Sequence, residues 1–86
     1  MKINELIKKI EKKIFKEIII DEILIEDKTY LHLKHKNFQK NKFHLKVFIK
    51  SKQLSDMTKI NSTKKIYQIL KFELKNYIHS IQIVLK

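Results

Sequence analysis

The hydrophobic positions along the chain change their period several times, and each change predicts a different element. Near the N-terminus they recur every three or four residues with lysines on the opposite side, which predicts an amphipathic helix over about residues 3–15. Residues 18–26 are rich in β-branched side chains and too apolar for a surface helix, so they favour a strand with an irregularity near Asp21 and Glu22. Residues 43–50 alternate between apolar and polar and give the clearest strand.

The C-terminal part of the chain is expected to add one helix and one strand. Apolar residues at spacings of three and four predict a helix over about residues 62–76, with Asn61 or Ser62 as its N-cap. Residues 80–85 alternate again and predict a third strand. The elements therefore follow one another in the order αββαβ.

This order predicts an α+β fold in a single domain spanning residues 1–86. A helix connects the second and third strands, so these two are expected to be parallel through a right-handed crossover, whereas the first two form an antiparallel hairpin. We expect a three-stranded mixed sheet covered on one face by two helices. The core predicted from the matching apolar faces contains Phe43, Leu45, Val47, Ile49, Ile66, Leu70, Leu74, Ile81 and Ile83.

Composition excludes most nucleotide-dependent enzymes. The 86 residues suffice for one small core, and the absence of cysteine and glycine excludes disulfides, thiol nucleophiles, thiolate zinc sites and glycine-rich phosphate-binding loops. The acid pairs at 21–22 and 26–27 point to opposite faces of an extended chain and cannot form an acid–base dyad. No apolar run approaches the roughly 20 residues of a membrane span. We therefore expect a non-enzymatic protein. Its expected location is the cytoplasm, with the nucleus as a second location, and it is expected to be monomeric when free.

The net charge of +11 is concentrated in the middle of the chain. All 20 basic residues are lysines, and residues 28–55 contain eight of them without a single acid, together with His32, His35 and His44. An anionic partner, nucleic acid included, is expected to meet the protein here, although a solvated lysine-rich loop explains the same composition equally well. Because residues 30–42 lack an apolar face, we expect them to be mobile in the free protein.

Several short motifs occur in a characteristic order in the second half of the chain. They are HLKVFIKS at 44–51, IN at 60–61, IY at 66–67, EL at 73–74 and IHSIQI at 78–83. With these motifs the chain resembles the BolA family without a gap, and DKTYLH at 27–32 resembles the start of that family's variable loop. The resemblance implies the family's αββαβ fold, a relative of the type II KH topology, in agreement with the order reached from periodicity.

The resemblance also implies a function. It implies a non-enzymatic adaptor that binds a monothiol glutaredoxin and shares a [2Fe–2S] cluster with it, in iron–sulfur trafficking or iron sensing; no cofactor is expected in the isolated protein. His79 matches the family's histidine before the last strand and is implied as an iron ligand, assisted by a loop histidine, His32 rather than His35. Neutral imidazole is a competent iron ligand beside thiolates. The alternatives are an ordinary polar residue at position 79 and unconstrained histidines in the loop.

Nucleic-acid binding is the second functional hypothesis. The lysine-rich middle supports it, but the KH module clamps the backbone with a G-x-x-G loop that this chain lacks. Phe43 and Phe48 are expected on opposite faces of one strand, so they cannot form a stacking row. His44 alternates onto the polar face of the same strand and is expected to be solvated. At 62–64 the chain has Ser-Thr-Lys where the family has Arg-His-Arg, which weakens this surface further.

Overall fold

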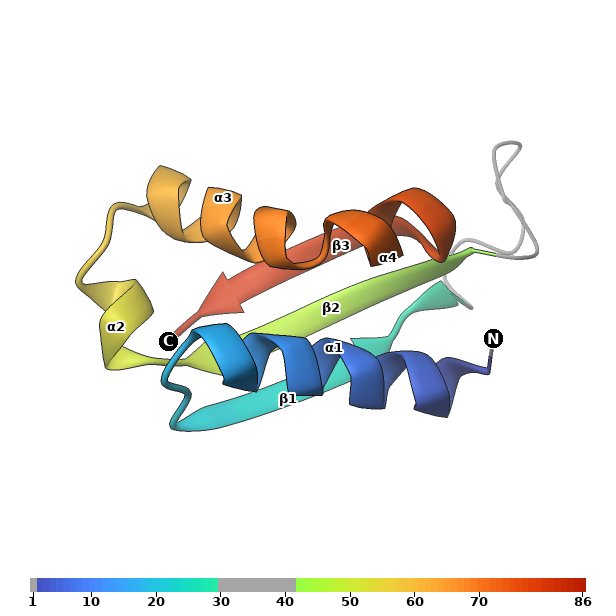
Figure 1. Ribbon diagram of the computed structural model, residues 1–86, viewed down its shortest axis with the longest axis horizontal. Helices are drawn as coiled ribbons and strands as arrows, with labels where there is room; N and C mark the ends of the chain where they lie inside the picture. The colour runs from blue at the N-terminus through green and yellow to red at the C-terminus, as the bar shows by residue number, and fades with distance from the viewer. Residues whose placement is uncertain (1, 30–41) are drawn as a thin grey trace.

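The expected order of elements is confirmed. The structure is a computed structural model that describes residues 2–29 and 42–86 of the chain (Figure 1). Its elements are α1 (Ile3–Glu17), β1 (Glu22–Asp27), β2 (Phe43–Lys50), α2 (Lys52–Ser55), α3 (Lys59–Ile69), α4 (Lys71–Asn76) and β3 (Ile78–Leu85). Within the described residues there are four helices instead of the two expected, because a short helix follows β2 and the second long helix is interrupted.

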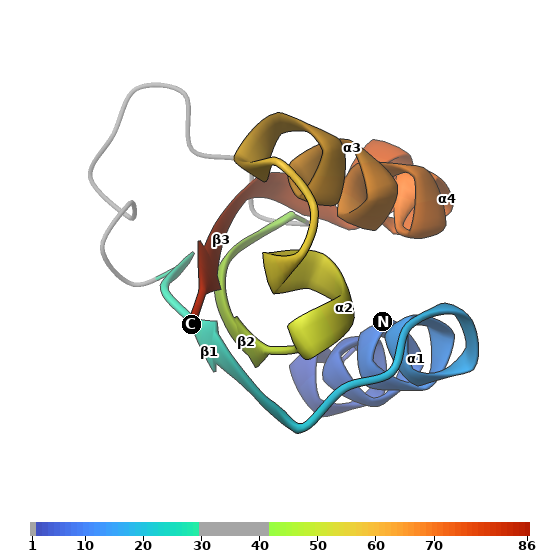
Figure 2. The ribbon, with the colours of Figure 1, turned by 90° about the vertical axis from the view of Figure 1, so that its left-hand side faces the viewer.

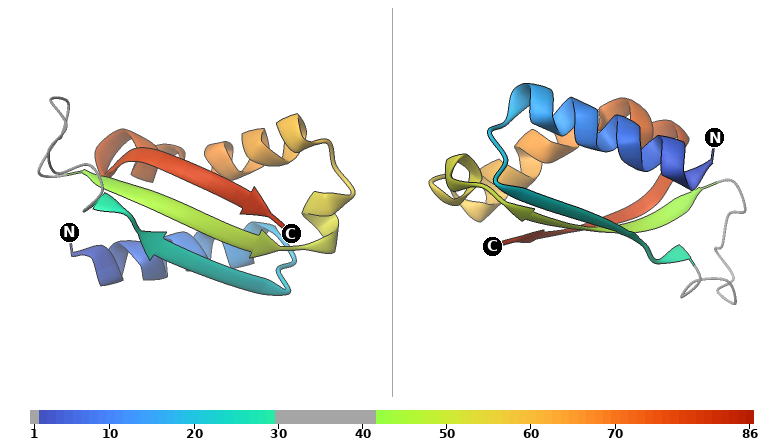
Figure 3. Two further views of the ribbon diagram at one scale, coloured as in Figure 1. Left: turned by 180° about the vertical axis from the view of Figure 1, so that it is seen from behind. Right: turned by 90° about the horizontal axis from the view of Figure 1, so that it is seen from below.

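The three strands form one mixed sheet in the order β1-β2-β3. β1 pairs with β2 in antiparallel orientation and β2 pairs with β3 in parallel orientation, as the connections predicted. In register, Leu24 lies opposite Phe48, which lies opposite Val84. The helices cover one face of this sheet, as the end-on view and the view from below show (Figures 2 and 3). No helix of the described residues covers the other face, which is called the open face below.

The core lies between the helices and the covered face of the sheet. Alternate residues of β2 point into it and are buried: Leu45, Val47 and Ile49. From the helices, α1 contributes Leu6, Ile10 and Ile14, and the α3–α4 layer contributes Ile66 and Leu70. Of the nine core residues predicted, five are buried, and the others pack against the core while half-buried: Phe43, Leu74, Ile81 and Ile83. The predicted core is therefore confirmed.

The prediction of a strand over residues 18–26 is wrong for its first part, because β1 begins only at Glu22. α1 extends to Glu17, and the backbone N–H of Ile18 closes its last turn on the carbonyl of Ile14 at 2.9 Å. The segment from residue 18 to residue 21 then turns the chain into β1, and the N–H of Asp21 joins the carbonyl of Lys50 at 2.9 Å. Ile18 is buried at this corner. Its apolar character therefore reflects burial at a helix end and carries no information about strand formation.

The N-cap expected at Asn61 or Ser62 is also wrong, because α3 begins one turn earlier. The hydroxyl of Thr58 accepts a hydrogen bond from the N–H of Asn61 at 3.1 Å and caps the helix. Ser62 lies inside the helix, fully buried, and its hydroxyl donates to the carbonyl of Lys59 at 3.0 Å. Such a bond back to the preceding turn satisfies a buried hydroxyl, so a serine can occupy a helix interior.

The helix expected at 62–76 is interrupted at Leu70, where α3 ends and α4 begins. The hydrogen bonds continue across this residue: the N–H of Leu70 donates to Ile66 and the N–H of Leu74 donates to Leu70. The apolar spacing therefore runs on unbroken, although the backbone of Leu70 leaves the helical region with φ −99° and ψ 17°. The bend keeps the helices in contact with the sheet. α4 ends at Asn76, and the chain then enters β3.

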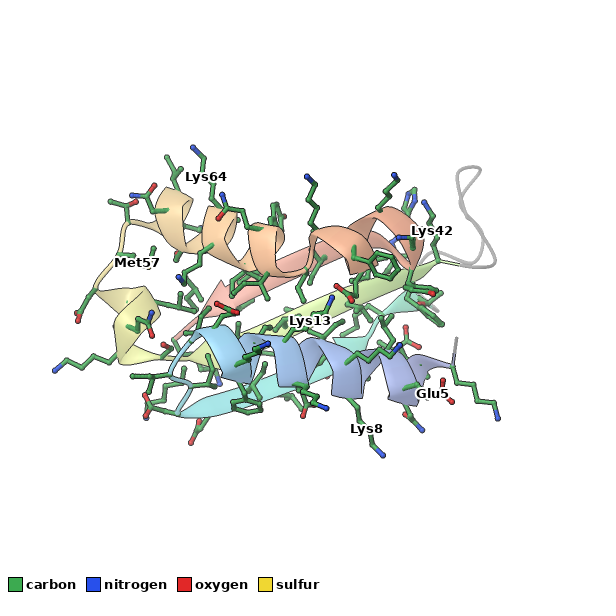
Figure 4. All side chains as sticks on the ribbon, in the orientation of Figure 1. Glu5, Lys8, Lys13, Lys42, Met57 and Lys64 are labelled. Atoms are coloured by element: carbon green, nitrogen blue, oxygen red, sulfur yellow. The ribbon has the colours of Figure 1, made fainter. Side chains whose placement is uncertain are left out.

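An ion pair with a buried carboxylate joins α1 to α4 within the helical layer. The carboxylate of Glu73 on α4 is almost fully buried, and its Oε2 accepts a hydrogen bond from Nζ of Lys13 on α1 at 2.6 Å. Lys13 projects from α1 toward the α3–α4 layer (Figure 4). Its amine also lies 5.6 Å from the ring centroid of Phe72, within cation–π range. Burial of a carboxylate is favourable only with such a partner, so the pair fixes how α1 and α4 pack.

Candidate functional site

The pairing of β2 with β3 contains a β-bulge at its first residues. Phe43 lies opposite Ile78, but the next residue of β2, His44, lies opposite Ser80. His79 is therefore an extra residue in β3, without a partner position in β2. Because of this extra residue, both Ile78 and Ile81 turn toward the core although three positions separate them. The bulge also brings two consecutive polar side chains of β3 next to one residue of β2.

Those side chains form a compact cluster with His44. The Oγ atom of Ser80 lies 2.7 Å from Nδ1 of His44, a hydrogen bond between residues 36 positions apart in sequence. The rings of His44 and His79 have centroids 4.8 Å apart and planes inclined by 58°. The two histidines differ in accessibility, since His44 is only 5% exposed whereas His79 is exposed. This group of His44, His79 and Ser80 is called the histidine cluster below.

The backbone of His44 is held from the side of β1. Its N–H donates to the hydroxyl of Thr29 at 3.1 Å, and its carbonyl accepts from the N–H of Lys28 at 2.7 Å. Thr29 is itself held by Asp27, whose carboxylate accepts hydrogen bonds from the N–H and the hydroxyl of Thr29. A carboxylate that accepts from the backbone two residues on is the usual way in which aspartate stabilises a turn. The turn after β1 therefore fixes one end of the histidine cluster.

The structure locates only some of the histidines predicted as ligands. His79 lies in the second position of β3, inside the strand that was expected to begin after it. His32 and His35 lie outside the described residues, as does most of the segment 30–42 that was expected to be mobile. The expectation that His44 is solvated is wrong. His44 does alternate onto the open face, but the bulge places His79 and Ser80 against it there.

The cluster offers one accessible imidazole. His79 is exposed, so its ring can meet a group carried by another molecule. In His44, Nδ1 is engaged by Ser80 and Nε2 is buried, so neither nitrogen faces the solvent. Among residues 2–29 and 42–86, no three histidine or acidic side chains lie close enough to hold a metal ion. This part of the chain can thus contribute a ligand to a shared metal group and cannot enclose one.

Lysine side chains lie beside the histidine cluster and farther along the open face of the sheet. A hollow of about 370 Å³ next to His44 and Ser80 is lined also by Lys28, Lys46 and Gln82. Lys28 has an acidic neighbour, since its Nζ lies 3.6 Å from Glu26.

Farther along the open face, the ring of Phe48 lies within cation–π range of two ammonium groups. Nζ of Lys46 is 5.0 Å from the ring centroid and Nζ of Lys86 is 5.6 Å from it. Phe43 packs against the core on the covered face. The two phenylalanines are therefore on opposite faces, as predicted, and provide no row of aromatic rings.

Sequence reasoning missed Ser80 and Thr29 as parts of this site. One signal for the bulge was available, because Ile78 and Ile81 are both apolar at a spacing of three in a segment that otherwise alternates. A strand with one extra residue explains such a break in alternation. The contribution of Thr29 had no comparable signal, since it depends on the turn that Asp27 closes.

Fold and site together define a small α+β binding domain, in which a hairpin and a parallel third strand present one exposed histidine among residues 2–29 and 42–86. The family described as BolA-like protein matches residues 14–86, so the chain belongs to the BolA-like family. No curated protein matches the sequence significantly.

Two solved structures from Arabidopsis thaliana are similar to this one, the BolA domain of SufE1 and BolA1. Each has a TM-score of 0.77 and 29% sequence identity, over 92% of this chain and 87% of the other. The αββαβ topology expected from the sequence is thus the topology of BolA domains. No helix in the described part of the chain is long and apolar enough to cross a membrane.

Proposed function

We propose that this protein is a non-enzymatic adaptor that binds a monothiol glutaredoxin and provides one histidine ligand to a [2Fe–2S] cluster that the two proteins share. The observation that carries the proposal is the exposure of His79 at a β-bulge, with its ring against the buried ring of His44. A bulge presents a side chain at the sheet surface without disturbing the core beneath it. Membership of the BolA-like family supports the adaptor role.

The donor atoms of the chain fit a shared cluster. The chain has no cysteine, so thiolate ligands must come from the partner. Imidazole can bind iron in such a cluster beside thiolate ligands. The cluster supplies transferable iron and sulfide, in trafficking or in sensing of iron. His79 would hold it from this side, and His32 or His35, outside the described residues, would assist. Lys46 beside the histidine cluster favours an anionic group electrostatically.

The decisive experiment mixes the pure protein with a monothiol glutaredoxin loaded with its [2Fe–2S] cluster. We expect a heterodimer by size-exclusion chromatography and a changed visible circular dichroism spectrum of the cluster. His79→Ala should abolish the spectral change while the far-UV spectrum and the thermal midpoint stay those of the wild type. Gln68→Ala, which alters an exposed residue of α3, is the control and should leave the changed spectrum in place. An unaltered heterodimeric cluster in His79→Ala would refute the assignment.

Binding of nucleic acid is the second candidate, favoured by the two ammonium groups that lie close to the ring of Phe48 on the open face. One aromatic ring provides a single stacking position, which is why this candidate ranks second. It would be supported by binding to single-stranded DNA or RNA whose affinity falls steeply with salt, combined with no effect of the glutaredoxin mixture. In that case Phe48→Ala should weaken binding and His79→Ala should not.

A further inference from the structure

We infer that Ser80 and His44 are positioning residues that hold the imidazole of His79 in one orientation for iron. The inference rests on the proposed function, since an orientation of His79 matters for iron only if His79 binds it. It goes beyond that function because it assigns a task to two residues that do not themselves bind the iron–sulfur cluster.

His79 needs such support because its side chain is exposed on a strand surface. An exposed side chain on a strand samples more than one staggered rotamer, and a metal ligand must present its nitrogen in one direction. Here the ring of His44 lies against the ring of His79 at 4.8 Å between centroids. A fixed neighbouring ring at this distance excludes those rotamers of His79 that would occupy the same space. Part of the ordering cost of ligand binding is thereby met before the partner arrives.

His44 is suited to be that fixed neighbour because it is held at three points. Its N–H and carbonyl are bonded to Thr29 and Lys28, and its Nδ1 is bonded to Ser80 at 2.7 Å. The side chain is also almost fully buried. Because its backbone and its ring are both restrained, His44 provides a rigid surface against which the ring of His79 packs. The same restraints argue against His44 as a ligand, because neither of its ring nitrogens faces the solvent.

Ser80 links the orientation of His44 to the position of His79. Ser80 directly follows His79 in the bulge. One short segment of β3 therefore carries both the proposed ligand, His79, and the hydroxyl that fixes the neighbouring ring of His44. Its hydrogen bond to Nδ1 selects one flip state of the His44 ring. Loss of that bond removes the hydrogen bond that favours this flip state, and the other flip state would present a different ring edge to His79. Hydrogen bonds that orient metal ligands from outside the coordination sphere commonly change metal affinity by about 10- to 100-fold.

The test has one measurement in the free protein and one in the complex. In the free protein, three-bond couplings of His79 and contacts between the two imidazole rings in NMR spectra report whether His79 keeps one rotamer. In the complex, the visible circular dichroism spectrum and the half-life of the cluster in the presence of a chelator report how well it is held. The variants are Ser80→Ala, which removes the hydrogen bond, and His44→Phe, which keeps a ring but cannot bond to Ser80.

The control is Ser55→Ala. It removes a serine hydroxyl bond of similar length, from Ser55 to the carbonyl of Lys52 at 3.0 Å, in the helix α2. We expect Ser80→Ala and His44→Phe to give rotamer-averaged couplings for His79, an altered cluster spectrum and a cluster half-life shortened about tenfold. Ser55→Ala should match the wild type in every measurement. Ser80→Ala alters a small exposed residue and should remain folded, so the test stands even if His44→Phe does not fold.

Two results would overturn the inference. The first is a single, unchanged rotamer of His79 in folded Ser80→Ala, because the hydrogen bond would then have no influence on the ligand. The second is loss of the mixed-cluster spectrum in folded His44→Phe together with a wild-type spectrum in Ser80→Ala, which would make His44 a ligand. If the wild-type protein forms no mixed cluster, the proposed function fails, whereas the ordering of His79 by Ser80 is still decided in the free protein.

Discussion

The amine of Lys13 on α1 and the buried carboxylate of Glu73 on α4 are 2.6 Å apart, and the two residues are separated by 60 positions in sequence. The side chain of Lys13 is 42% exposed and that of Glu73 is 3% exposed. The pair is thus asymmetric. Lysine retains part of its hydration, whereas the carboxylate depends on its partner inside the protein.

We therefore predict that Lys13→Met destabilises the protein more than its exposed position suggests. Loss of the amine leaves a buried acceptor unsatisfied, at a cost of about 1–3 kcal/mol. Urea unfolding measures the difference, with the neighbouring exposed Lys12→Met as the control. The double variant Lys13→Met, Glu73→Leu should regain most of the loss, because no carboxylate remains to be solvated. Equal stabilities for Lys13→Met and Lys12→Met would contradict the prediction.

A second prediction separates the observed N-cap of α3 from the one that the sequence suggested. Thr58→Ala removes the hydroxyl that accepts from Asn61, and should lower the free energy of unfolding by about 1 kcal/mol. For a domain of this size, that corresponds to a fall of about 4–8 °C in the thermal midpoint. Asn61→Ala keeps the backbone N–H that donates, so its effect should stay within about 0.5 kcal/mol. The opposite ranking of the two variants would place the cap at Asn61.

A third prediction concerns the turn that holds His44. Thr29→Val keeps the shape of the side chain but removes the hydroxyl that accepts from the N–H of His44. We expect the amide of His44 to exchange with solvent at least tenfold faster, and stability to fall by about 1–3 kcal/mol because a donor at a buried residue loses its acceptor. Hydrogen-exchange NMR measures the first effect. Asp21→Ala, at an exposed position before β1, is the control and should leave this amide protected.

A fourth prediction concerns the two loop histidines. In the complex with glutaredoxin, His32→Ala should alter the cluster spectrum or weaken cluster retention, since His32 follows the segment that resembles the start of the family's loop. His35→Ala should have the smaller effect. Neither substitution should prevent formation of the complex without cluster, which titration calorimetry measures. A larger effect of His35→Ala would exchange the two assignments.

The accuracy of the sequence predictions follows from how local each element is. The bounds of β2 are those predicted, because every second residue from Phe43 to Ile49 is apolar and the strand is flanked by the polar residues Lys42 and Ser51. The start of β3 was missed, since an extra residue breaks the alternation there. The bend at Leu70 could not be predicted, because the spacing from Ile66 through Leu70 to Leu74 is that of a continuous helix.

The candidate site was less accessible to sequence reasoning than the fold. His79 is a candidate through its resemblance to a family motif, and no spacing or composition argument selects it. The hydrogen-bond partner of the His44 ring is Ser80, which lies 36 positions away and reaches it through the parallel pairing of two strands. Contacts of this kind are set by strand register, and a single slipped residue changes them all. The alternation of a strand predicts which face a residue occupies, but it does not predict which side chains lie against it on that face.

The extra residue in β3 has a consequence for how such a site can arise or disappear. Deleting one of the two residues between Ile78 and Ile81 would restore regular alternation, with both isoleucines still facing the core and all later pairs with β2 unchanged. The histidine is thus supplementary to the ladder of the sheet. Loss or gain of a single codon can remove or introduce it while every core side chain keeps its side. In evolutionary terms, the proposed ligand and the scaffold can vary independently.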